Sequence, residues 1–365
     1  MLYVTRGYAA CETTDAIDEA VALAERSGNL TQFVSWATRR WLGPFNSGDL
    51  PAASMLADQA LELALREGSP RAIGMAHAVQ TLTRHHHGDL AGADNQYTAG
   101  LKFFDDPGFR QVPGAALWTF SVASDNAWML GRADVARERM ARMMTAVNEN
   151  NPHDVAISGI AAATLHDLLS EDKQAEALAA RALELSEKNQ FPPEAAYSRC
   201  ALGRARMQLG RPTEGIELLR QGIASSLEGG LRLTIPAYTA SLAEALGREG
   251  AIVEALATVE HALQANRDQL VNRPDIIRVR GELRLKAEQP ELAEADFRDA
   301  IELAQKMGAK AWELRTTISL ARLLAKHGRR DEARAMLAEI YGWFTEGFDT
   351  ADLKGAKTLL DELSG

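Results

Sequence analysis

The sequence predicts an all-α fold, a solenoid of about eight helix–turn–helix repeats with a period near 40 residues. Three observations support this prediction. The composition is 46% hydrophobic but only 6% aromatic, with few β-branched runs, which favours helix over sheet. A small residue recurs at a nearly constant interval, and a glycine usually precedes it at a fixed distance. The prolines fall only where such repeats would have connections or first helical turns.

Eight anchor positions carry the recurring small residue, at spacings between 38 and 43 residues. These anchors are Ala53, Ala93, Ala136, Ala175, Gly215, Ala255, Ala293 and Ala333. The residues seven positions further on, six of them small, are Ala60, Gly100, Met143, Ala182, Gly222, Ala262, Ala300 and Ile340. An offset of seven is two helical turns, so both positions share one face and allow two helices to approach closely.

A turn residue lies five positions before each anchor and is glycine in six of the eight units. These residues are Gly48, Gly88, Gly131, Ser170, Gly210, Gly250, Glu288 and Gly328. Glycine fits a helix C-terminus that turns with positive φ, so each unit should be helix A, a turn and helix B. The residues eight after the anchors should supply the core beside the close contact: Leu61, Leu101, Met144, Leu183, Ile223, Leu263, Ile301 and Tyr341.

The 12 prolines agree with this register. Pro51, Pro212 and Pro290 fall in the first turn of a helix B, where the missing N–H costs nothing. Pro44 falls in the first A-to-B turn. The other eight, which fall in B-to-A connections, are Pro70, Pro107, Pro113, Pro152, Pro192, Pro193, Pro236 and Pro274.

Residues 1–365 are expected to form one domain, although the length alone suggests about two to three. Residues 1–30 should form an N-terminal helical unit, 31–340 the repeats, and 341–365 a C-terminal capping helix that closes the stack. Thr350 is the expected N-cap of this last helix. Its apolar face would consist of Leu353, Ala356, Leu360 and Leu363.

Charge and cysteine content exclude several classes of function. The net charge of −10 argues against direct nucleic-acid binding, which needs clustered positive charge. Cys11 and Cys200 are too few for a disulfide framework or a thiolate metal cage. No stretch is apolar enough to span a membrane and the N-terminus does not resemble a secretory signal, so a cytoplasmic location is expected.

Motifs of catalysis are absent from the sequence. It contains no G-x-x-x-x-G-K-[ST], no His-Glu-x-x-His and no Gly-x-Ser-x-Gly, and we expect no enzyme activity, no cofactor and no metal. The run His85-His86-His87 ends a predicted helix A and is interpreted as a solvated helix end, with a metal or ligand role as the alternative. Cys200 is expected to be a small buried apolar residue rather than a nucleophile.

The glycine and the two small residues resemble the second half of a tetratricopeptide repeat (TPR), and Leu202-Gly203 resembles the Leu-Gly pair of its helix A. This resemblance implies a right-handed superhelix. The run Tyr341–Thr350, followed by Asp352-Leu353 and Ala356-Lys357, is similar to the tail of bacterial signalling proteins. Those proteins carry an adenylate/guanylate cyclase domain, a predicted ATPase domain and a C-terminal TPR-like array. Both catalytic domains are missing from this sequence.

The TPR resemblance implies that helix A lines the concave surface. The candidate binding residues on that surface are Trp118, Asp125, Trp128, Tyr197, Arg204, Arg248, Arg278, Glu282, Arg315, Arg322 and Lys326. The wall of the last four units carries seven basic and three acidic residues, counting Lys286, Glu244 and Asp275 with those above. An aromatic zone beside a basic zone suits an acidic, partly apolar protein or peptide segment. Alternatively, the basic side chains are solvated and the tryptophans pack between helices.

These features predict a non-enzymatic interaction or regulatory module that binds a partner protein or peptide in its groove, in bacterial signalling. The alternative is a sensor of a small molecule or peptide inducer. An open groove over several repeats would favour the first, whereas an enclosed, aromatic-lined pocket of a few hundred Å³ would favour the second. The sequence leaves open the oligomeric state and whether the chain is part of a longer protein.

Overall fold

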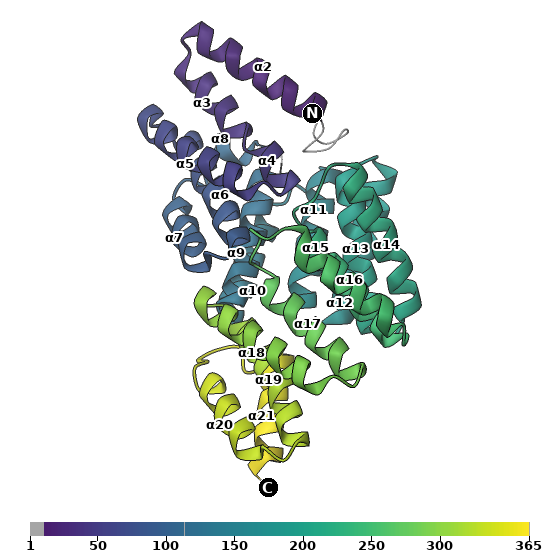
Figure 1. Cartoon of the computed structure of the whole chain (residues 1–365). Helices are drawn as coiled ribbons and strands as arrows, with labels where there is room; N and C mark the ends of the chain where they lie inside the picture. Colours follow the sequence, from purple (N-terminus) through teal and green to yellow (C-terminus); the bar gives the residue numbers. More distant parts are fainter. Residues whose placement is uncertain (1–10, 113, 365) are drawn as a thin grey trace.

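The computed structural model describes residues 11–112 and 114–364, and in these ranges the chain forms helices, turns and connections without a strand. The helices, shown in Figure 1, are α2 (Cys11–Ser27), α3 (Leu30–Arg39), α4 (Leu42–Ser47), α5 (Leu50–Glu67), α6 (Pro70–His87), α7 (Leu90–Gly100), α8 (Pro107–Arg110), α9 (Ala115–Met129), α10 (Ala133–Thr145), α11 (Pro152–Leu168), α12 (Asp172–Lys188), α13 (Pro192–Gln208), α14 (Pro212–Glu228), α15 (Ile235–Arg248), α16 (Ile252–Ala265), α17 (Arg273–Lys286), α18 (Pro290–Met307), α19 (Lys310–Lys326), α20 (Arg330–Tyr341) and α21 (Ala351–Ser364). The predicted all-α solenoid of TPR-like repeats is confirmed.

Helix pairs build the solenoid unit by unit. In the first unit α3 and α4 together take the place of helix A, and α5 is helix B. The later pairs are α6/α7, α9/α10, α11/α12, α13/α14, α15/α16, α17/α18 and α19/α20. Helix B of each unit packs against its own helix A, and α21 packs against α19 and α20 at the C-terminal end.

All eight turn residues adopt positive φ, including the two that are not glycine. Ser170 has φ 59° and Glu288 has φ 58°, whereas the six turn glycines have φ between 79° and 85°. Most prolines of the B-to-A connections occupy the first two positions of the A helices, as Pro152 does in α11. Pro44 lies inside the short helix α4 instead of in a turn, because the turn comes later, at Gly48. Pro113 lies outside the described residues.

The small anchors and their partners seven residues later are all buried, as the close-contact interpretation requires. A Cβ atom on Gly222 would lie 2.4 Å from Cys200 Sγ and 2.9 Å from the Ala196 carbonyl oxygen, so α13 and α14 touch backbone to side chain. The prediction for the large residues is only partly right. Leu263 and Ile301 are buried, but the side chain of Met144 is 48% exposed.

The superhelix closes on itself. Helix α19 of the last unit contacts α9 of the third unit directly, as can be followed in Figure 1. The connection between α16 and α17 reaches the first two units: Asn266 Nδ2 donates to the Gly48 carbonyl at 3.1 Å, and Leu270 N donates to the His86 carbonyl at 3.1 Å. We call these contacts, together with those of the α20–α21 connection described next, the seam.

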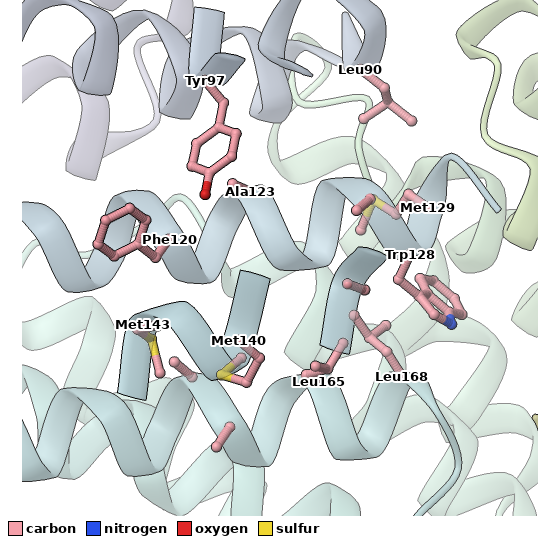
Figure 2. Packing of buried hydrophobic residues seen from close by; sticks show 14 of the residues in the cluster. Leu90, Tyr97, Phe120, Ala123, Trp128, Met129, Met140, Met143, Leu165 and Leu168 are labelled. Atoms are coloured by element: carbon pink, nitrogen blue, oxygen red, sulfur yellow. The ribbon is translucent and has the colours of Figure 1, made fainter. Parts of the chain in front are cut away.

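The α20–α21 connection forms the second part of the seam. Glu346 Oε1 accepts the backbone N–H of Asp134 at 2.9 Å, at the N-terminus of α10. Arg137 pairs with Asp349 at 3.2 Å. Figure 2 shows the largest buried cluster, which includes Phe120 and Leu165 and continues across the seam to Trp312 of α19. Helices α6–α11 therefore share one hydrophobic core with α18 and α19.

Candidate functional site

The closed superhelix surrounds a central cavity of about 300 Å³. Its lining comes from the A helix of every unit and from the connections that precede several of them. The aromatic members of the lining are Trp41, Phe45, Trp118, Tyr197, Tyr238 and Trp312, together with the imidazoles of His85 and His86. Ring closure explains the cavity, because it turns the concave faces of all units toward one another.

Four of the predicted site residues line this cavity: Trp118, Asp125, Tyr197 and Arg204. The rings of Trp118 and Tyr197 meet edge to face with centroids 6.2 Å apart, which joins α9 to α13. Trp128 lies elsewhere. It is buried in the core of the seam with 3% of its surface exposed, and thus packs between helices, the alternative that the sequence left open.

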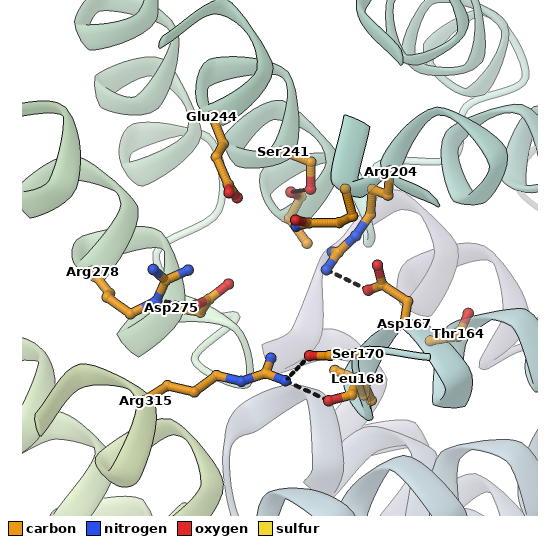
Figure 3. Close-up of polar contacts among 12 residues, drawn as sticks. Thr164, Asp167, Leu168, Ser170, Arg204, Ser241, Glu244, Asp275, Arg278 and Arg315 are labelled. Carbon is orange, nitrogen blue, oxygen red and sulfur yellow. Dashed lines mark hydrogen bonds and ion pairs between the residues drawn. The ribbon is translucent and has the colours of Figure 1, made fainter. Parts of the chain in front are cut away.

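The basic residues expected on the inner wall are largely neutralised by acidic neighbours. Arg204 pairs with Asp167 at 2.6 Å and Arg278 with Asp275 at 2.7 Å (Figure 3). Arg248 pairs with Glu244 at 2.7 Å. Burial acts to lower the pKa of Arg278, but Asp275, Glu244 and the partly buried Glu282 together raise it. The cavity therefore contains ion pairs and has no free basic zone.

Arg315 is a clamp within the fold. Its guanidinium bonds the carboxylate of Asp352 on α21 at 2.9 Å and the Leu168 carbonyl at the end of α11, as Figure 3 shows for Leu168. It also lies over the ring of Trp128, with Cζ 4.7 Å from the centroid. Arg322 is exposed on the surface of α19 and Lys326 at its end, and neither lines the central cavity.

The histidine run at the end of α6 is not the solvated helix end that was predicted from the sequence. His85 is 4% exposed, and its Nδ1 donates to Asn126 Oδ1 at 3.0 Å. Burial lowers the pKa of His85 to about 4, and burial together with His85 lowers the pKa of His86 to about 3. The prediction of a solvated helix end is thus wrong for His85 and His86. The seam covers this end of α6, and the imidazoles of both residues line the cavity.

Asp125 is the least compensated charged group in the cavity. Its Oδ1 atom is buried and has no hydrogen-bond partner among the described residues. Burial raises the pKa of Asp125 well above its usual range. Gln269 Oε1, in the connection between α16 and α17, is likewise buried without a partner in the described chain. Unsatisfied polar atoms at a cavity wall are suited to contacts with a bound molecule.

Cys200 is a buried free thiol, as predicted, and burial raises its pKa, which leaves it unreactive. Within residues 11–112 and 114–364, no three His, Cys, Asp or Glu side chains lie close enough together to hold a metal ion. None of the described helices combines the length and apolar character that crossing a membrane requires.

Comparisons with known proteins show the fold. No family model matches the chain, and no curated protein matches it. Among solved structures, the complex of Rap protein with Competence and Sporulation Factor has TM-score 0.57 at 9% identity, over 91% of this chain and 96% of that chain. The Cut9 assembly of APC/C has TM-score 0.56 at 13% identity, over 97% and 60%. Human IFIT1 with PPP-AAAA has TM-score 0.52 at 12% identity, over 96% and 77%.

Proposed function

We propose that this chain is a non-enzymatic regulatory module that holds a small molecule or a short peptide segment in its central cavity. The observation that supports the proposal best is the cavity itself, about 300 Å³ in volume, lined by residues from all units and by aromatic side chains from several of them. This size and lining are typical of ligand sites. The sensor alternative from the sequence is therefore favoured over the scaffold.

The seam gives ligand binding a route to a conformational response. The cavity lining includes Trp41 from the first unit and Trp312 from the last, which lie on opposite sides of the closure. A molecule that contacts both sides stabilises the closed ring relative to an opened one by its difference in affinity for the two states. The Rap structure of similar fold was solved with Competence and Sporulation Factor bound, which supports a ligand-holding role.

A second candidate function is binding of an acidic protein segment on the outer surface. Arg322 and Lys326 are exposed on α19, in the unit whose second helix, α20, leads into the signalling-type tail Tyr341–Thr350. The similarity of this tail to bacterial signalling proteins supports a role in regulating a partner there. In this combined proposal the cavity would receive the signal and the C-terminal surface would pass it on.

Filling the cavity tests the leading proposal. Ala237 lines the cavity from α15, and Ala237→Trp would occupy part of its volume; Val253→Trp, at a position 86% exposed on α16, is the matched control. A library of metabolites and short peptides is screened for compounds that raise the melting temperature. We expect hits whose effect persists in Val253→Trp and disappears in Ala237→Trp. The proposal of a cavity ligand would be refuted if no compound raised the melting temperature, or if the compounds that did so raised it equally in both variants.

A further inference from the structure

The charge pattern of the cavity carries information about its ligand. Four carboxylates line it: Asp125, Asp167, Glu244 and Asp275. Three of them are bound to an arginine at 2.6–2.7 Å, as described above. Asp125 has no such counterpart within the described chain, and burial is the cause of its altered titration. The cavity thus contains one acid, Asp125, whose Oδ1 atom is buried and which has no basic partner in the described chain.

Other lining groups would contact a ligand together with Asp125 on α9. Trp118 lies two helical turns before Asp125 on the same face, where both line the cavity. Gln269 Oε1 is a second buried acceptor without a donor among the described residues. Arg204 Nε is a buried donor in the same condition, but the charge of Arg204 is already balanced by Asp167. The unmet demand of the cavity is therefore for positive charge and N–H donors.

We infer that the cavity binds a cation: a protonated amine or guanidinium that pairs with Asp125, carried on an apolar or aromatic body that contacts Trp118. This inference rests on the proposed ligand-holding function. A buried carboxylate gains most from a partner that supplies both charge and hydrogen bonds, and such bonds are stronger than neutral ones. An anionic ligand would face more carboxylates than basic groups. The cation could belong to a free amine or to a lysine or arginine of a peptide.

Binding of a cation should be coupled to proton release. The cation needs the ionised form of Asp125, whereas burial favours the protonated form in the empty cavity. Affinity should therefore rise with pH. The other titratable or charged groups lining the cavity are Arg39 on α3, His85 and His86 on α6, Asp167 on α11, Tyr197 and Arg204 on α13, Tyr238 and Glu244 on α15, and Asp275 on α17.

The test compares ligands of matched shape and different charge. The probes are 2-phenylethylamine, propylbenzene and 3-phenylpropionate, together with a library of amines and Lys- or Arg-containing dipeptides sorted by charge, measured by calorimetry and melting temperature. The variants are Asp125→Asn and Asp125→Glu, with Asp299→Asn at an exposed position of α18 as the control.

We expect cations to dominate the hits and to bind at least about tenfold more weakly to Asp125→Asn, while Asp299→Asn binds like the parent chain and Asp125→Glu retains part of the affinity. The free-amine and dipeptide arms identify the source of the cation. Neutral or anionic hits that Ala237→Trp abolishes would overturn the cation inference and leave the cavity function standing. Hits insensitive to Ala237→Trp, or none, would overturn both.

Discussion

Trp128 on α9 and Trp312 on α19 meet edge to face with ring centroids 4.8 Å apart, although they belong to the third and the last unit of the solenoid. Trp312 Nε1 donates to the Val271 carbonyl at 3.1 Å, so the same side chain also fixes the connection before α17. Edge-to-face pairs of aromatic rings add to the stabilisation from burial alone. This pair lies where the two halves of the solenoid meet and helps to hold the ring closed.

Two matched substitutions can separate the contribution of the seam contacts to stability from the cost of a positive-φ turn. Gly131 and Gly250 have nearly equal φ, 81° and 83°. A Cβ atom on Gly131 would lie 2.7 Å from Trp343, whereas within the described chain nothing lies within 4 Å of one on Gly250. Both Gly→Ala changes should cost about 1–2 kcal/mol for the left-handed backbone. Gly131→Ala should lose about 1–3 kcal/mol more through overpacking.

Chemical denaturation of both variants measures this difference, and small-angle scattering reports whether the Gly131→Ala ring opens. Equal losses of stability in the two variants would mean that the α20–α21 connection does not press against this turn in solution.

The anchor register gives a second prediction, on a helix remote from the seam. Ala255 on α16 is fully buried at the close contact, and Ala257 on the same helix is exposed. We expect Ala255→Leu to lower the free energy of unfolding by about 1–3 kcal/mol, because the added methylenes force the helices apart. Ala257→Leu should change it by less than about 0.5 kcal/mol. Similar melting curves for the two variants would show that the register is misassigned.

Much of the fold was predictable because it depends on local geometry. A turn that needs positive φ selects glycine, and a close helix contact selects alanine or glycine, so both leave a periodic trace in the sequence. Ser170 and Glu288 could be recognised as turn residues although they are not glycine. The anchors that follow them, Ala175 and Ala293, and the alanines two helical turns after those anchors, Ala182 and Ala300, keep the pattern.

The candidate site was predictable only in part, because it depends on closure of the ring. Asn266 and Leu270 reach the first two units through single backbone-directed hydrogen bonds, which leave no periodic signal. Without the closure, His85 looks like an exposed helix end and Arg315 like a free basic residue. Spacing along one helix placed Trp118 and Asp125 correctly on the inner face. It could not show that other helices supply acids for Arg204 and Arg315, which pair with Asp167 of α11 and Asp352 of α21.

Arg315 offers a third prediction, because the sequence treats it like Arg322 and the structure does not. Arg315 is 17% exposed in its side chain and bonds Asp352 and the Leu168 carbonyl, whereas Arg322 is exposed. Arg315→Ala should reduce the free energy of unfolding by about 2–4 kcal/mol, because Asp352 loses its charge partner. Arg322→Ala should stay within about 0.5 kcal/mol of the parent chain. Urea titrations measure both, and a small effect at Arg315 would contradict its role as a clamp.

The pH dependence of stability provides the last prediction. Burial raises the pKa of Asp125 in the folded chain, so between about pH 4 and that raised pKa the folded state binds more protons than the unfolded state. Its contribution to stability is therefore present at low pH and is lost as the pH rises. The amide of Asp125→Asn does not titrate, so this variant does not lose stability in this way. The free energy of unfolding of Asp125→Asn minus that of the parent should therefore grow by more than about 1 kcal/mol from pH 4 to pH 8.

The histidines act in the opposite direction, since their lowered pKa values near 4 and 3 make both chains less stable as the pH falls below about 6.5. This contribution is common to parent and variant and cancels in the difference. Urea titrations across the pH range, without ligand, measure the gap. A gap that stays constant, or that shrinks as the pH rises, would mean that Asp125 has a positive partner in the empty cavity and is not available to a cationic ligand.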